Sequence, residues 1–319
     1  MNPSVKIFSG TESEKLAQKI ANRFGGTLGK INIQRFSDGE IQPVFLESIR
    51  GDYVFLVQST CAPAANIMEL LLMIDAAKRA SAYKIIAVIP YYGYARQDRK
   101  DRPRVAIGSK LIATLLEAAG ATRVITMDLH AAQIQGFFEI PVDHLDSSAI
   151  FIPYIEQLKL ETLTFAAPDV GSTNRVREIA SYFNSEMVIC DKHRKRANEI
   201  ASMVVIGDVE GKDIVLIDDI CDTGGTLAKA AGLLKEKGAK SVRALCTHPV
   251  LSGNAYENIE NSVLEELVVC DTIPLKRHID KIKVISVADL FAIAIRNAYE
   301  NKSITSLFIH SQLKAKRAQ

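Results

Sequence analysis

Short apolar runs alternate along the chain with longer stretches in which apolar residues recur at a helical period. Strands are predicted at 53–57, 85–90, 124–127, 163–166, 188–189, 214–217, 242–246, 268–270 and 284–286. Helices are predicted between several of them, the clearest at about 64–80 and 108–119. Short strands separated by helices are typical of parallel sheets covered on both faces. The chain is therefore predicted to be an α/β protein.

The most informative stretch is 214–227, where an apolar run ends in two adjacent carboxylates, Asp218 and Asp219. Asp222 then leads into Thr223-Gly224-Gly225-Thr226, and a stretch with helical periodicity follows. This order predicts a buried strand, a tight loop and the N-terminus of a helix.

Such a loop can hold a sugar phosphate. Glycine lets the backbone approach a ligand closely, and the N–H groups and dipole of a helix N-terminus favour an anion. Paired carboxylates can accept hydrogen bonds from neighbouring ribose hydroxyls. The alternative is an ordinary strand–loop–helix joint, but two carboxylates beside a core strand cost free energy unless they are paired or functional. The loop resembles the ribose-phosphate loop of the phosphoribosyltransferase-type fold.

The chain contains an internal repeat of sequence pattern. Residues 51–61 align without gaps on 211–221, and 84–90 correspond to 241–249. This predicts two related domains. One spans 1–146, completed by a C-terminal helix of about 290–319, and the other spans 147–289. Gln58-Ser59 stands where the second copy has its acidic pair, and Ala62–Ala65 replaces the glycine loop. Only the second domain is therefore expected to bind a sugar phosphate.

Composition narrows the function class. The chain has 319 residues, 48% of them hydrophobic, and a formal net charge of +2. This balance gives no reason to expect a nucleic-acid or membrane partner. No apolar run is long enough to span a membrane, and charged residues near the N-terminus argue against a signal peptide. The five cysteines show no paired spacing, so neither a zinc site nor disulfides are indicated, and a cytoplasmic location is expected.

A dense charge run follows the strand predicted at 85–90. Five of the nine residues from Arg96 to Arg104 are basic. A polyphosphate needs a concentrated set of such donors, and a mobile loop could close over a nucleotide and exclude water. The alternative is a solvated surface loop.

Several smaller patterns can serve the same chemistry. Phe36 could stack on a purine while Asp38 and Glu40, on either side of Gly39, accept hydrogen bonds, although an exposed turn is an equal alternative. His130 lies just past a predicted strand, where ligand-binding residues collect in open α/β sheets, but a lone histidine is often structural.

Two further patterns involve strand ends. Asp169 follows a predicted strand and is either a Mg²⁺ ligand or a helix N-cap. Lys192 and Arg194 alternate, so an extended backbone would place both on one face, where two cations could stabilise a transferring phosphoryl group. The alternative for this pair is a basic surface turn.

Together these motifs resemble the ribose-phosphate pyrophosphokinase family of the bacterial class I type, over nearly the whole chain. The matching segments are 36–40, 91–99, 128–131, 168–171 and 214–227. The resemblance implies two phosphoribosyltransferase-type domains, each with a mostly parallel sheet flanked by helices. It also implies transfer of the pyrophosphoryl group of Mg-ATP to the 1-hydroxyl of ribose 5-phosphate, giving phosphoribosyl pyrophosphate and AMP, with Mg²⁺ as cofactor.

The resemblance also implies roles for individual residues. ATP-binding positions are Phe36, Asp38, Gly39, Glu40, Arg96 and Gln97. Metal positions are His130 and Asp169, and catalytic positions are Lys192, Arg194 and Arg99. Ribose 5-phosphate positions are Arg194, Asp218, Asp219, Asp222, Thr223, Gly224, Gly225 and Thr226.

The family implies a homo-oligomer, a hexamer, with phosphate and ADP as effectors. The effector positions Ser48, Arg50, Ser303 and Thr305 match only loosely. The chain also has Gly171-Ser172-Thr173 where family members usually carry two glycines. Two alternatives stay open: a phosphoribosyltransferase that consumes phosphoribosyl pyrophosphate, and a non-catalytic regulatory subunit of a synthetase.

Overall fold

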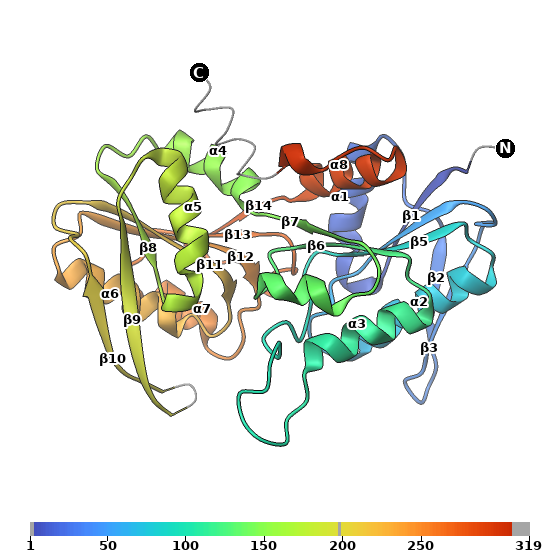
Figure 1. The fold of residues 1–319 in the computed structure, drawn as a ribbon, viewed down its shortest axis with the longest axis horizontal. Coiled ribbons are helices and arrows are strands. Elements are labelled where there is room, and N and C mark those ends of the chain that lie inside the picture. The colour runs from blue at the N-terminus through green and yellow to red at the C-terminus, as the bar shows by residue number, and fades with distance from the viewer. Residues whose placement is uncertain (1–2, 197–198, 308–319) are drawn as a thin grey trace. The chain divides into compact units, whose positions relative to one another are not determined.

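The computed structural model describes residues 3–196 and 199–307 (Figure 1). These residues form two compact units. The first unit contains 3–146, 272–274 and 286–307, and the second contains 147–271 and 275–285.

The first unit is built on a five-stranded sheet with the strand order β1-β4-β5-β6-β7, in which every neighbouring pair is parallel. The strands are β1 (Val5–Ser9), β4 (Tyr53–Val57), β5 (Lys84–Ile89), β6 (Arg123–Met127) and β7 (Val142–Leu145). The helices are α1 (Glu14–Phe24), α2 (Ala65–Arg79), α3 (Gly108–Ala119) and α8 (Ala288–Tyr299), with 3₁₀ turns η1 (Thr11–Ser13), η2 (Ala132–Phe137) and η4 (Thr305–Leu307). A separate hairpin pairs β2 (Ile31–Arg35) with β3 (Ile41–Phe45).

Helices cover both faces of this sheet: α2 and α3 lie on one side, and α1 and α8 pack together on the other (Figure 1). The α2–α3 side forms one apolar core in which Leu70, Met73 and Leu116 pack with the sheet residues Leu56 and Ala87. This agrees with the near-continuous apolar runs of the strands, because both faces of each strand are buried.

The second unit is built on a seven-stranded sheet with the order β10-β9-β8-β11-β12-β13-β14. The strands are β8 (Leu163–Ala167), β9 (Met187–Arg196), β10 (Glu199–Ile206), β11 (Asp213–Cys221), β12 (Ser241–Pro249), β13 (Leu267–Cys270) and β14 (Ile282–Ile285). All neighbouring pairs are parallel except β9–β10. The helices are α4 (Ser148–Leu158), α5 (Thr173–Phe183), α6 (Gly225–Glu236) and α7 (Ala255–Glu260), with the 3₁₀ turn η3 (Val170–Ser172).

The two units share one plan. Strands β1-β4-β5-β6-β7 run in the same order as β8-β11-β12-β13-β14, and both central strands pair with their neighbours in the same register. Gly51 and Gly211 both have positive φ, and their N–H groups donate to Ser81 and Gly238, two further residues with positive φ. These matching turns confirm the fold class and the internal repeat predicted from the sequence.

Some elements differ from the predictions. The strand predicted at 214–217 continues to Cys221, so Asp218 and Asp219 lie inside β11 rather than after it. The reason is that β12 pairs with β11 over its whole length, whereas the pairing with β8 covers Asp213–Leu216. The helix predicted at about 290–319 is α8, which ends at Tyr299, and residues 308–319 lie outside the described residues.

Candidate active site

The stretch predicted to hold a sugar phosphate forms a strand, a tight loop and a helix, as expected from its sequence. β11 ends at Cys221, and α6 begins at Gly225. The turn between them depends on Gly224, whose φ is +71°, a conformation that L residues adopt at a cost. A Cβ at Gly224 would also lie 3.2 Å from the Ala255 carbonyl oxygen and 3.3 Å from Ile259. Glycine is therefore required here by both the backbone and the packing.

The first turn of α6 offers donors to an anion. The N–H groups of the first residues of a helix have no partner within the helix, and the dipole is positive at this end. Gly224 is the N-cap and has no side chain that could fill this role, and the first turn of α6 carries no acidic residue. The turn is thus suited to a phosphate.

Contacts from α7 and the segment before it hold the loop. The Ser252 hydroxyl donates to Asp222, and the Ser252 N–H donates to the Asp222 carbonyl at 2.9 Å. The Asn258 amide donates to the Thr223 carbonyl at 2.8 Å. Ser252 and Asn258 were not predicted, because single polar residues about 30 positions downstream carry no signal of a contact with this loop.

Three carboxylates converge beside the loop. Burial raises the pKa of Asp218 well above its usual range, and the neighbouring charges of Asp219 and Asp169 raise it further. Asp219 is buried, and its N–H donates to the Asp218 carboxylate at 3.1 Å. Carboxylates that repel one another in this way cost free energy in the free protein and mark a place for cations or hydroxyl donors.

Asp169 takes the N-cap position that was one of its two predicted roles. Its carboxylate accepts a hydrogen bond from the Ser172 N–H at 3.2 Å, which makes it the N-cap of η3. It also lies close enough to Asp218 to raise the pKa of that residue. Oxygen donors of this kind match the ligand preference of Mg²⁺, so the residues present fit the ion. Among residues 3–196 and 199–307, however, no group of three or more His, Cys, Asp or Glu side chains is arranged to hold a metal by itself.

Cys221 is a structural residue. Its side chain is buried, and burial followed by the charges of Asp218 and Asp222 raises its pKa to about 12. The thiol therefore stays protonated near neutral pH and is not a nucleophile.

The counterpart loop in the first unit is closed by structural contacts. Gln58, in the place of Asp218, is fully buried, and its amide donates to Glu69 at 3.0 Å. Ser59, in the place of Asp219, donates to the Thr272 carbonyl at 2.6 Å and accepts from the Tyr91 N–H at 3.2 Å. This supports the expectation that the first unit lacks a second sugar-phosphate loop.

The predicted ATP residues Phe36 to Glu40 form the turn of the β2–β3 hairpin. The Phe36 N–H donates to the Glu40 carbonyl and the Gly39 N–H donates to the Phe36 carbonyl, both at 2.9 Å. The Glu40 N–H donates to the Asp38 carboxylate at 3.0 Å, and Gly39 has a φ of +95°. The Phe36 side chain is 41% exposed, an unusual position for a large apolar ring and a suitable one for stacking.

The charge run forms an exposed loop before α3. Arg96, Gln97 and the residues from Arg99 to Arg104 are all exposed. The ends of the loop meet where the Ser109 N–H donates to the Gln97 carbonyl at 3.2 Å. Asp98 accepts a hydrogen bond from the Gln133 amide, also at 3.2 Å. The loop is thus fixed at its base, and its basic side chains face solvent.

The remaining predicted residues lie at strand ends or on a strand. His130 is exposed and follows β6 and the buried Asp128, which has a positive φ of 40°. Lys192 and Arg194 lie within β9, which confirms the extended backbone expected there. Their backbones are opposite Met203 and Ile200 of β10, and the structure does not describe their side chains.

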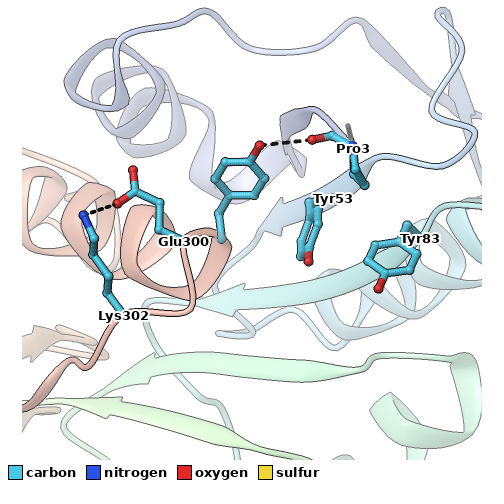
Figure 2. A pocket seen from close by; sticks show the side chains of 6 residues that line it. Pro3, Tyr53, Tyr83, Glu300 and Lys302 are labelled. Carbon is cyan, nitrogen blue, oxygen red and sulfur yellow. Dashed lines mark hydrogen bonds and ion pairs between the residues drawn. The ribbon is translucent and has the colours of Figure 1, made fainter. Parts of the chain in front are cut away.

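A pocket of about 660 Å³ lies at the end of the first unit's sheet where β4 and β5 begin, opposite to the end where these strands finish (Figure 2). Pro3, Tyr53, Tyr83, Tyr299, Glu300 and Lys302 line it. Tyr53 packs edge-on against Tyr83 and Tyr299, with ring centroids 5.3 and 5.2 Å apart. None of the predicted site residues lines this pocket.

Fold and loop together define the class of this protein. It is a phosphoribosyltransferase-type α/β protein with two units of one plan, and the second unit carries a glycine-containing loop between β11 and α6. A family model described as the N-terminal domain of ribose phosphate pyrophosphokinase matches residues 5–120. Another, described as the phosphoribosyl synthetase-associated domain, matches residues 174–309. The chain belongs to the ribose-phosphate pyrophosphokinase family.

Individual relatives agree. The chain is 56% identical to ribose-phosphate pyrophosphokinases of Porphyromonas gingivalis and Wolinella succinogenes, over 95% of this chain and 97% and 99% of theirs. The crystal structure of phosphoribosylpyrophosphate synthetase from Mycobacterium smegmatis superimposes with a TM-score of 0.89 at 38% identity, covering 93% of this chain and 99% of that one. The family resemblance drawn from the sequence motifs is thus confirmed. No helix within the described residues is long and apolar enough to cross a membrane.

Proposed function

We propose that this chain is a ribose-phosphate diphosphokinase, which transfers the pyrophosphoryl group of Mg-ATP to the 1-hydroxyl of ribose 5-phosphate for nucleotide biosynthesis. The observation that carries the proposal is the loop after β11, where buried carboxylates stand next to a glycine turn and a helix N-terminus. Full-length relatives that are more than half identical carry the name of this activity.

The second unit binds the sugar. Asp218 and Asp219 accept hydrogen bonds from the ribose 2- and 3-hydroxyls. The backbone N–H groups of the segment from Asp222 to Thr226, Thr223, Gly224 and Gly225 included, bind the 5-phosphate. The 1-hydroxyl then loses its proton to solvent and its oxygen attacks the β-phosphorus of ATP. The bond from that phosphorus to the α-phosphate oxygen breaks, and AMP leaves with its electron pair.

The first unit supplies the nucleotide contacts. Phe36 stacks on the adenine. Asp38 and Glu40 accept hydrogen bonds from the nucleoside, and Gly39 lies between them in the same turn. Arg96 and Gln97 make further contacts with ATP. Arg99 and the exposed loop after it neutralise phosphate charge. Lys192 and Arg194 do the same at the transferring group, and Arg194 also contacts ribose 5-phosphate. Positioning and charge neutralisation account for most of the rate enhancement in such transfers.

His130 and Asp169 are the proposed metal positions, and Mg²⁺ bound there would neutralise phosphate charge. The domain limits predicted from the sequence, 1–146 with the C-terminal segment and 147–289, place the two substrates on different repeats. The proposal also includes a homo-oligomer, which is a hexamer in the family, and a cytoplasmic location. It further includes control of the activity by phosphate and ADP. Three of the four proposed effector positions make polar contacts in the structure. The Arg50 guanidinium donates to the Ser81 hydroxyl at 3.2 Å, and the Ser303 hydroxyl donates to the Thr305 hydroxyl at 2.7 Å.

The decisive assay incubates the purified chain with ATP, ribose 5-phosphate, Mg²⁺ and inorganic phosphate and follows the products by ³¹P NMR. The proposal requires AMP and phosphoribosyl pyrophosphate in equal amounts. A chain that makes no AMP but releases pyrophosphate from phosphoribosyl pyrophosphate and a nitrogenous base would instead be a phosphoribosyltransferase. A chain inactive in both assays would be the non-catalytic subunit.

A further inference from the structure

One buried carboxylate occupies the place in the first unit that corresponds to the sugar site of the second. The strand registers pair Val5 with Tyr53 and Leu163 with Asp213. Counting on from these pairs, past the strand ends where needed, makes Gln58 the counterpart of Asp218 and Thr11 the counterpart of Asp169. The two mutually repelling carboxylates of the second unit are thus replaced in the first by two groups that can donate hydrogen bonds.

Both of these groups donate to Glu69 of α2, whose side chain is fully buried. Oε1 accepts from the Thr11 N–H at 2.6 Å and from the Gln58 amide at 3.0 Å. Oε2 accepts from the Thr11 hydroxyl at 2.9 Å and from the Arg35 guanidinium at 3.3 Å. A buried carboxylate needs this many donors to offset its desolvation, so each oxygen is committed.

Arg35 connects this cluster to the hairpin. It is the last residue of β2 and immediately precedes the Phe36–Glu40 turn. Its side chain is 48% exposed, whereas its partner Glu69 is not exposed at all. The buried Glu69 carboxylate fixes the position of the Arg35 guanidinium. The backbone at Arg35 and at the start of the Phe36–Glu40 turn is therefore restrained.

We propose that Glu69 is a positioning residue for nucleotide binding, which holds Arg35 and thereby the Phe36–Glu40 turn in the conformation that receives ATP. The former sugar-site position of the first unit has become the anchor of the nucleotide turn. This inference rests on the proposed function, because it takes that turn as part of the ATP site.

The hairpin offers a matched control at its other end. Glu47 pairs with Lys6 and accepts from the Lys30 N–H at 2.7 Å, next to the first residue of β2. Glu47→Gln weakens the same hairpin at its open end, far along both strands from the turn. A general loss of hairpin stability would follow from either substitution, but only the loss of Glu69 releases the turn.

The test compares Glu69→Gln, Arg35→Met and Glu47→Gln with the wild type. In Glu69→Gln, the amide cannot accept on both sides, so an N–H₂ group faces either Arg35 or Thr11 and Gln58. KM for ATP and the Kd of a non-hydrolysable ATP analogue should both rise about tenfold, as loss of one charge-assisted contact predicts, while KM for ribose 5-phosphate stays within about twofold. Arg35→Met, at an exposed side chain, should fold normally and shift the same two constants. Glu47→Gln should shift neither by more than about twofold.

A double variant tests the route of the effect. If Glu69 acts through the turn, Glu69→Gln added to Phe36→Ala should raise KM for ATP by a smaller factor than Glu69→Gln does in the wild type. A lower unfolding temperature with unchanged nucleotide constants, equal rises in both KM values, or the same shift in Glu47→Gln would overturn the inference. Absence of AMP formation by the wild type would instead refute the proposed function.

Discussion

The two adjacent glycines of the sugar-phosphate loop should respond to alanine in opposite ways. Gly224 has a φ of +71°, and a Cβ there would meet the Ala255 carbonyl oxygen at 3.2 Å. The left-handed conformation alone costs about 1–2 kcal/mol for an L residue, so Gly224→Ala should lower the free energy of unfolding by at least that amount. Gly225 begins α6 with ordinary helical φ, and the nearest atom to its Cβ, Thr223 Oγ1, is 3.7 Å away.

Gly225→Ala should therefore leave the free energy of unfolding unchanged or raise it by up to about 1 kcal/mol, since alanine favours the helix. If the loop binds the 5-phosphate through its backbone, the new methyl group occupies the space that lets the phosphate approach. KM for ribose 5-phosphate should then rise at least about tenfold, equivalent to about 1.4 kcal/mol of lost binding, with KM for ATP nearly constant.

Gly232→Ala, later in the same helix, is the control, because its Cβ would meet no atom within 4 Å. It should stabilise the protein without changing either KM. Steady-state kinetics and urea unfolding of the three variants measure all of these quantities. A Gly225→Ala enzyme with wild-type KM for ribose 5-phosphate would show that the phosphate does not approach this backbone, and the assigned binding mode would be wrong.

Three further predictions concern charge. Lys192→Ala should lower kcat by about two or more orders of magnitude in steady-state assays, as the loss of one preorganised charge contact does, and a near wild-type kcat would remove Lys192 from the mechanism. Asp218→Asn should abolish most turnover yet stabilise the free protein near neutral pH, because burial and the charges of Asp219 and Asp169 raise the pKa of Asp218 in the folded state. Because the folded-state pKa of Asp218 is raised, the wild type keeps its full stability below the unfolded pKa near 4 and loses stability as pH rises through the folded-state pKa. The unfolding temperatures of the wild type and Asp218→Asn should therefore converge at acidic pH. Chelation of Mg²⁺ should stop AMP formation, and added Mg²⁺ should restore it without refolding.

The fold was predictable where periodicity was strong. The helix at 108–119 and the strand at 53–57 match α3 and β4 residue for residue, because both are long or continuous apolar patterns. The strands β2 and β3 were not predicted, because polar residues interrupt the apolar residues in both, whereas all five residues of β4 are apolar or aromatic. The hydrophobic pattern also placed the end of β11 too early. The pattern depends on side chains, whereas the strand continues past Ile217 through backbone hydrogen bonds with β12.

The candidate site was predictable only as separate segments. The spacing of Asp218, Asp222 and Gly224 indicated an anion loop because each residue type there has a local physical reason. Residues far away in the sequence complete the site. The charge of Asp169 raises the pKa of Asp218, and the Asn258 amide donates to the Thr223 carbonyl. Such contacts depend on tertiary packing, and a single sequence contains no local signal of them.

The repeated plan explains how one fold handles two substrates. In each unit, a helix follows the first strand and a hairpin precedes the central strand: α1 and β2–β3 in the first, α5 and β9–β10 in the second. In the second unit both the loop after the central strand and the hairpin carry proposed chemistry, at Asp218 and Lys192. In the first unit Gln58 and Glu69 pair at the corresponding loop position, and the hairpin carries the proposed nucleotide turn. On the proposed function, the two units bind different ligands because the hairpin is a second position that the same fold provides for binding.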